Sequence, residues 1–264
     1  MRRLTDPALA LVAPQSRIGA MSDDHGRAAA WPSAWPNGSP GTSIWMPVVN
    51  SPFCPQPVLA ARVSFSCVSS SALAFWQSER SDHLDELVSA HNLVSGPARG
   101  RRWRTQALNE ALILRLAVEF QGFARDLHDL SCEHFALWTS PSSPALQGVI
   151  QNALRLNRDL DRGNAQPGSL GKDFGRFGFE LWPALALRTR RSKMLNDSLE
   201  HLNTARNGLA HADEVKLAGL KVDGYPIVLN TFRKWRKHLD LLSEHLDAEV
   251  SSQLAKLFGQ PAPW

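Results

Sequence analysis

The sequence predicts an all-α protein, because two kinds of pattern alternate over most of its length. Beyond the first 71 residues, apolar side chains recur three and four positions apart, which places them on one face of a helix. Stretches that contain glycine, proline or serine interrupt this spacing at Gly96-Pro97, 139–144 and 163–168, as expected for turns. We therefore expect a helical bundle over residues 72–259 and a short tail at 260–264.

Residues 1–71 differ in composition from the rest of the chain. They hold most of the prolines and many serines, include Trp31-Pro32-Ser33-Ala34-Trp35-Pro36, and show neither a helical nor a strand period. Proline removes a backbone donor and restricts the residue before it, so we expect a disordered or loosely extended arm. An alternative is that translation starts at Met21 or Met46. Two prolines interrupt the weakly apolar start, so no signal peptide is expected.

The first half of the helical region predicts two helices. The first runs from about Leu73 to Asn92 and is amphipathic. The second covers about 103–138 and is apolar nearly all round, because further apolar residues widen its core face. A helix of this kind belongs at the centre of a bundle or at a dimer seam.

The second half predicts three further helices and two connecting segments. A helix at about 145–160 is followed by a glycine- and aromatic-rich insert, 168–186, which should pack its aromatic side chains on the bundle. The last two helices end near His211 and Leu257. The stretch between them, 217–228, contains three turn-forming residues and predicts a turn or short hairpin.

Composition narrows the function only slightly. The 264 residues carry a formal net charge of +4 and the isoelectric point is near 9.2, which permits an anionic partner such as RNA without requiring one. Three cysteines with no CxxC pair argue against a disulfide framework or a zinc site and fit a reducing cytoplasm. No apolar run approaches eighteen residues, so we expect no membrane span.

The stretch Arg206-Asn207-Gly208-Leu209-Ala210-His211 carries the most chemistry, and we call it the motif. Histidine titrates near neutral pH and can move the protons of phosphodiester cleavage. Arginine is permanently charged, and its planar donor fork matches phosphate oxygens. On a helix Asn207 and His211 share a face, with Arg206 about 100° round. Gly208 is expected to loosen the helix so that Arg206 and His211 converge.

A structural interpretation of the motif stays open beside the catalytic one. Arginine and histidine five positions apart occur by chance in many helical proteins, where the histidine is commonly a surface residue. In that case Arg206 would pair on the surface with one of three nearby carboxylates, a contact that contributes little. The candidate partners are Asp197, Glu200 and Asp213.

Three further residues are candidates because they are polar within the apolar helix at 103–138. Glu119 needs a partner there, and both a pair with Arg115 and support of Arg206 remain open. Arg125 and His128 lie within a polar cluster further along the helix, and His128 is a candidate second base of the active site.

The region from about Leu73 to Phe258 resembles the HEPN superfamily of small helical proteins, many of which are toxins or RNA-cleaving defence proteins. The resemblance lies in the Arg-x4-His motif and in the order of elements. A long apolar helix containing Val118-Glu119-Phe120-Gln121-Gly122-Phe123-Ala124-Arg125-Asp126-Leu127-His128 precedes the motif helix, and an amphipathic helix follows it.

The resemblance implies a metal-independent endoribonuclease without a cofactor. His211 would act as general base or acid, Arg206 would stabilise charge on phosphorus, and Asn207 would position His211 or bind the phosphate. Homodimerisation would bring two motifs to one RNA cleft, and an antitoxin or other regulatory protein is a further implied partner. One toxin subclass is regulated by nucleotidylation of a tyrosine two positions after the histidine. We expect no such regulation here, because Asp213 occupies that position. The competing hypotheses are a catalytically inactive HEPN-like interaction module and a helical regulator that binds nucleic acid without cutting it.

Overall fold

The apolar spacing of the chain is realised as helices throughout the part described by the structure. This computed structural model describes residues 69–96 and 102–264, all within one unit of the chain, Arg62–Trp264. The prediction of a disordered arm falls almost entirely outside these residues, as do Cys54 and Cys67. No strand occurs in the described ranges, so the all-α prediction is confirmed for them. None of the helices described is long and apolar enough to span a membrane.

The helices follow one another with short connections. Their bounds are α1 Ser71–Phe75, a π-helical segment η1 Trp76–Arg80, α2 Ser81–Ser95, α3 Arg102–Thr139, α4 Pro144–Arg155, α5 Asp159–Arg162, α6 Pro167–Gly175, α7 Leu181–Arg188, α8 Ser192–Ala210, α9 Glu214–Val222 and α10 Leu229–Phe258.

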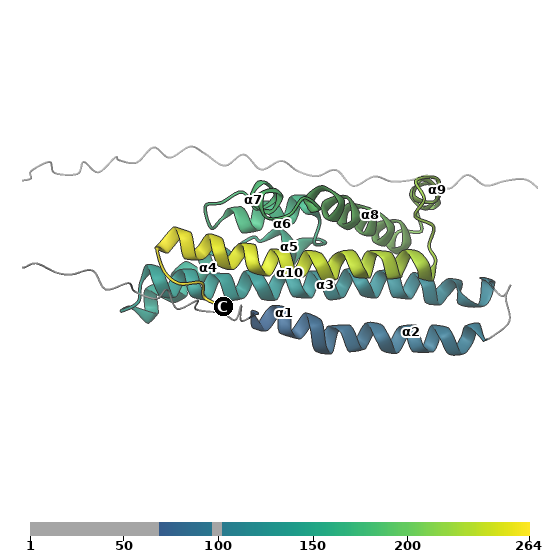
Figure 1. Ribbon diagram of the computed structural model, residues 1–264, viewed down its shortest axis with the longest axis horizontal. Helices are drawn as coiled ribbons and strands as arrows, with labels where there is room; N and C mark the ends of the chain where they lie inside the picture. Colours follow the sequence, from purple (N-terminus) through teal and green to yellow (C-terminus); the bar gives the residue numbers. More distant parts are fainter. Residues whose placement is uncertain (1–68, 97–101) are drawn as a thin grey trace, which may run out of the picture. The chain divides into compact units, whose positions relative to one another are not determined.

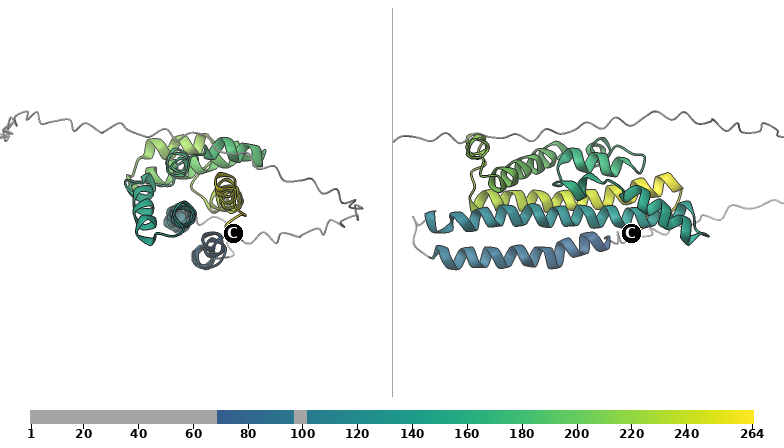
Figure 2. Two further views of the ribbon diagram at one scale, coloured as in Figure 1. Left: turned by 90° about the vertical axis from the view of Figure 1, so that its left-hand side faces the viewer. Right: turned by 180° about the vertical axis from the view of Figure 1, so that it is seen from behind.

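The long helix α3 lies at the centre of this unit, one of the two positions that its apolar surface predicted. It packs against α2, α4, α8 and α10, and Figure 1 shows α10 beside it over much of its length. The end-on view of Figure 2 shows α6 to α9 as a layer across α3 and α10, on the side opposite α2. The core face of α3 is fully buried at Leu112, Leu116, Phe120, Phe123 and Leu127.

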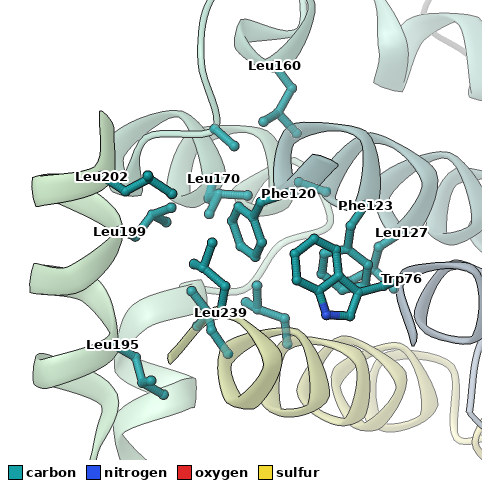
Figure 3. Close-up of a cluster of buried hydrophobic side chains, with 14 of the residues drawn as sticks. Trp76, Phe120, Phe123, Leu127, Leu160, Leu170, Leu195, Leu199, Leu202 and Leu239 are labelled. Atoms are coloured by element: carbon teal, nitrogen blue, oxygen red, sulfur yellow. The ribbon is translucent and has the colours of Figure 1, made fainter. Parts of the chain in front are cut away.

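Aromatic side chains join α3 to its neighbours. Trp76 lies with its ring centroid 5.9 Å from those of both Phe120 and Phe123, and the contact with Phe120 is edge-to-face. Such a pair contributes about 0.5–1.5 kcal/mol beyond the burial of its area. Figure 3 shows leucines of α6, α8 and α10 gathered on the other side of Phe120, so that one core serves both layers.

The predicted hairpin at 217–228 is wrong in its first half, where α9 forms. Asp213 caps this helix by accepting a hydrogen bond from the backbone of Lys216 at 3.1 Å. Gly208 has a different role from the one predicted, because α8 runs through it unbroken. A Cβ atom at Gly208 would lie 2.8 Å from Leu217 Cδ2, so glycine lets α9 pack closely on α8.

The C-terminal end of α8 is a Schellman motif, which sets the direction of the chain after His211. The amide of Asp213 donates to Gly208 O at 2.8 Å, and that of Ala212 donates to Leu209 O at 3.4 Å. This pattern places Ala212 in the left-handed region, with φ +50°. Glycine usually occupies this position, because an L side chain is strained there.

Two further segments pack more closely than a loop and a tail would. The insert predicted at 168–186 forms α6 and α7, and its Phe174 and Phe177 are buried as expected. Residues 260–264 are fastened to α10, because Trp264 Nε1 donates to Asp247 O at 3.3 Å and Ser251 Oγ donates to Trp264 O at 3.1 Å.

Replacing Ala212 with glycine should stabilise the protein by about 0.5–1 kcal/mol. The substitution relieves the strain of the left-handed backbone, and this gain exceeds the cost of the greater conformational entropy that glycine gives the unfolded chain. Urea unfolding followed by circular dichroism measures the difference. The matched control is Ala210→Gly, two residues earlier and still helical, which should destabilise by a similar amount. A loss of stability in Ala212→Gly would contradict the account of this turn.

Candidate functional site

The motif residues Arg206, Asn207 and His211 lie at the C-terminal end of α8. Leu195, Leu199, Leu202 and Ala205 bury the inner face of α8 in the core. Arg206 and Asn207 follow on the half-buried flank, while His211 is exposed as the C-cap residue, with φ −109° and ψ 7°. The motif is therefore held by a rigid helix and ends on an imidazole open to solvent.

Asn207 joins the motif to the rest of the fold. Its Oδ1 accepts two hydrogen bonds, from Arg206 Nη1 at 3.2 Å and from Asn164 Nδ2 at 2.7 Å. A guanidinium can only donate, so this contact fixes which end of the Asn207 amide is oxygen. Asn207 thus holds the Arg206 side chain by a hydrogen bond that does not neutralise its charge.

The segment 160–166, which carries Asn164, is fastened from two helices. From α3, Gln121 Nε2 donates to Gly163 O at 2.5 Å and to Leu160 O at 3.0 Å. Arg125 Nε also donates to Leu160 O, at 2.8 Å. From α8, Asn203 Nδ2 donates to Ala165 O at 3.0 Å. The candidate Arg125 therefore does not contact the motif but holds the segment that does.

Arg206 makes no ion pair with any carboxylate of the residues described. Of its three candidate partners, Asp197 pairs with Lys193 at 2.7 Å and Asp213 pairs with Lys216 at 3.1 Å. The hydrogen bond from the Lys216 amide, followed by that from its ammonium, lowers the pKa of the Asp213 carboxyl. The side chain of His211 likewise has no hydrogen-bond partner in the described part of the chain.

Glu119 pairs with cations other than Arg206. Its carboxylate accepts from Arg80 Nη1 at 2.8 Å, from Arg115 Nε at 2.6 Å and contacts His83 Nδ1 at 3.0 Å. Burial opposes its ionisation, yet the hydrogen bonds from Arg80 and His83 and the Arg115 charge together lower its pKa. Gly122 makes room for this network, since a Cβ there would overlap the Arg80 guanidinium. The sequence left Arg115 and Arg206 open as partners of Glu119, and in the structure Glu119 pairs with Arg115.

His128 is fully buried and both of its ring nitrogens face protein groups. Nε2 lies 3.2 Å from Asp173 O, which can only accept, and Nδ1 lies 3.2 Å from Arg158 Nη1, which can only donate. These contacts fix the neutral tautomer with its hydrogen on Nε2. Burial, followed by the Arg158 charge, lowers the pKa of His128 to about 4. The imidazole contacts none of the three motif residues.

A pocket of about 250 Å³ opens beside the motif. Asn207 belongs to its wall, together with Gln166, Pro167, Gly168, Glu200, Asn203 and Thr204. The pocket lies between two helices of one layer, because Gln166, Pro167 and Gly168 form the start of α6 and the other lining residues lie on α8. The pocket is lined mainly by amide and carboxylate groups, so it suits a small polar ligand rather than an apolar one.

The sequence reasoning missed Asn164, which bonds to Asn207, and Asn203, which holds the segment that carries Asn164. Asn203 stands four residues before Asn207 on the same helix, and this spacing was the available signal. Asn164 lies in a stretch that reads only as a turn, and nothing local distinguishes it. Within the described ranges, no group of three or more histidine, cysteine or acidic side chains is arranged to hold a metal ion. Cys132 is buried, and burial raises its pKa to about 12.

Comparisons of the chain with protein-family models, with curated proteins and with solved structures found no match.

The Asn164–Asn207 hydrogen bond should appear as a coupling in stability. In a double-mutant cycle with Asn164→Ala and Asn207→Ala, either single variant removes the bond. We therefore expect the double variant to lose about 1 kcal/mol less unfolding free energy than the sum of the two single losses. Urea unfolding of the four proteins measures it. Asn164→Ala combined with Asn152→Ala on exposed α4 provides an additive control. Additivity in both cycles would mean that the bond does not hold Asn207.

His128 should make the stability fall in acid. Its folded pKa is about 4 against a usual value of 6.5, so the unfolded chain binds the proton first as the pH decreases. The stabilisation is therefore complete above pH 6.5 and is lost between 6.5 and 4, by up to about 3 kcal/mol. Subtracting the unfolding free energy of His128→Gln at each pH cancels the shared titrations. A difference that stays constant from pH 7 to pH 4 would refute this assignment.

Proposed function

We propose that the chain is a metal-independent endoribonuclease that cleaves RNA by attack of the 2′-hydroxyl. The observation that carries the proposal is the state of Arg206, whose guanidinium bonds to the neutral amide of Asn207 and to no carboxylate of the described residues. It lies five residues before an exposed imidazole, His211, at the end of the same helix. A cation and a titratable group so placed are what phosphodiester cleavage by proton transfer requires. The resemblance of the motif to HEPN ribonucleases supports the same proposal.

The chemistry follows from the roles of these groups. A base removes the proton of the 2′-hydroxyl, whose oxygen attacks phosphorus and forms a new P–O bond. The bond from phosphorus to the 5′-oxygen breaks, and an acid donates a proton to that oxygen. The products are a 2′,3′-cyclic phosphate and a 5′-hydroxyl. Arg206 donates to the phosphate oxygens, where negative charge accumulates in the transition state.

One motif does not supply both proton-transfer groups. His211 can act as base or as acid in one event, and His128 is neutral and engaged on both nitrogens. The second imidazole therefore comes from the motif of another copy of the chain, as in the HEPN proteins that this one resembles. In the resulting homodimer two copies of Arg206 would clamp one phosphate.

The proposal predicts cleavage that persists in EDTA and depends on the motif. A labelled RNA pool should be cut by the wild type, whereas His211→Ala should lower the rate by at least about 100-fold, since one general acid or base contributes 10² to 10⁴. Arg206→Ala should have a comparable effect. The control is His245→Ala, which removes a half-buried imidazole of α10 outside the motif and should leave the rate unchanged.

The end groups provide a second readout. The 5′-hydroxyl fragments should not be ligated through a 5′-phosphate until a kinase adds one, and the other fragments should not be ligated at their 3′ ends until the cyclic phosphate is opened and the phosphate removed. Equal cleavage by wild type and His211→Ala would indicate a contaminating nuclease and overturn the proposal. RNA binding without cleavage, or neither, would favour the inactive interaction module.

A further inference from the structure

We propose that the pocket beside Asn207 binds a guanine base, through its Watson–Crick edge, and so selects where the RNA is cut. The inference rests on the proposed function, because it gives the ribonuclease its base specificity. It stands on the position of the pocket, on the orientation of the amides in its wall and on one carboxylate.

The pocket is continuous with the motif. Along α8, Glu200, Thr204, Asn207 and His211 lie at positions 0, 4, 7 and 11, a spacing that keeps them on one side of a helix. Asn207 is both a motif residue and part of the pocket wall. A nucleotide whose phosphate meets Arg206 therefore has the pocket within reach of its own or the neighbouring base.

Hydrogen bonds outside the pocket fix how its two asparagines are turned. Asn203 Nδ2 donates to Ala165 O at 3.0 Å and to Leu199 O at 2.9 Å, so its nitrogen is engaged and its Oδ1 is left to accept. Asn203 is only 5% exposed, so these two bonds hold its amide in one orientation. Asn207 is turned the other way, because its Oδ1 is used by Arg206 and Asn164, and its Nδ2 is left to donate.

Glu200 determines which base fits. Its carboxylate only accepts, and no described residue forms a hydrogen bond or close ion pair with it. The nearby Lys193 pairs with Asp197 and interacts with Glu200 only through its charge. A negative group in this wall disfavours a phosphate and favours an edge that presents adjacent donors. Guanine has such an edge, in N1–H and the N2 amino group, and its O6 beside them accepts from an amide such as Asn207 Nδ2.

The other bases match this wall less well. Uracil presents a single donor between two carbonyl oxygens, which would face the acceptors of Glu200 and Asn203. Adenine and cytosine each present one amino group beside an unprotonated ring nitrogen, and that nitrogen would face a carboxylate oxygen. Only guanine offers two neighbouring N–H groups to one carboxylate, a pairing as directional as the bidentate contacts that read bases elsewhere.

The first test is binding, which does not depend on catalysis. The full chain is titrated with GMP, AMP, CMP and UMP and followed by calorimetry. We expect GMP to bind about tenfold more tightly than the others, and Glu200→Gln to abolish that preference, since glutamine places an N–H against one guanine donor. Glu244→Gln, which removes one exposed carboxylate of α10, is the matched control and should keep the preference. Equal affinities for the four nucleotides, no binding of any, or a preference unchanged in Glu200→Gln would overturn the inference.

The second test separates this inference from the proposed function. Cleavage sites of wild type and Glu200→Gln are mapped on an RNA that contains all sixteen dinucleotide steps. Cuts confined to steps with a guanine on a constant side, which spread to other steps in Glu200→Gln, support the inference. Cleavage indifferent to base in the wild type overturns the guanine pocket and leaves the ribonuclease. GMP-selective binding without cleavage supports the pocket and overturns the ribonuclease.

Discussion

The burial of α3 is the constraint on which the other elements depend. Its apolar side chains contact the helices around it, so α1, α2, α8 and α10 are each placed by the same axis. The few polar groups on α3 are used where they can be satisfied. Glu119 is surrounded by cations, and the absence of a side chain at Gly122 leaves room for Arg80 to lie across α3 and reach that carboxylate. A buried carboxylate without these partners would be strongly destabilising.

The same helix reaches the motif through a chain of amide contacts. Gln121 donates to the carbonyl oxygen of Gly163, and the next residue, Asn164, donates to Asn207 Oδ1. The same oxygen accepts from Arg206. Each link is a hydrogen bond between a side chain and a group whose donor or acceptor role is fixed by its chemistry. The position of the guanidinium is therefore determined by residues far from it in the sequence. A substitution on α3 can shift Arg206 without touching it.

Periodicity predicted the long helices, because each buries an apolar stripe long enough to be read. It failed for α9, where nine residues with one glycine carry only a weak stripe, and the capping by Asp213 and the contact of Leu217 with Gly208 decide the outcome. The motif residues could be chosen from their chemistry alone. The partner Asn164 of Asn207 could not be predicted, since it is one polar residue in a turn. The pairing of Glu119 with Arg80 could not be predicted either, because the two residues lie far apart in the sequence. Tertiary contacts of this kind leave no local pattern.

The choice of an amide as the neighbour of Arg206 has an electrostatic consequence. A carboxylate at that position would form an ion pair, and an incoming phosphate would have to compete with it for the same donors. Asn207 orients the guanidinium through a hydrogen bond to a neutral oxygen, which is weaker than an ion pair with a carboxylate. The remaining donors and the charge of Arg206 are therefore available to an anion. Glu200, in the pocket wall with Asn207, opposes that anion at a distance and forms no close ion pair among the residues described. Arg206 in the motif and Glu200 in the pocket wall carry opposite charges. They favour a ligand that is anionic at one end and rich in N–H donors at the other, which is the charge pattern of a guanine nucleotide.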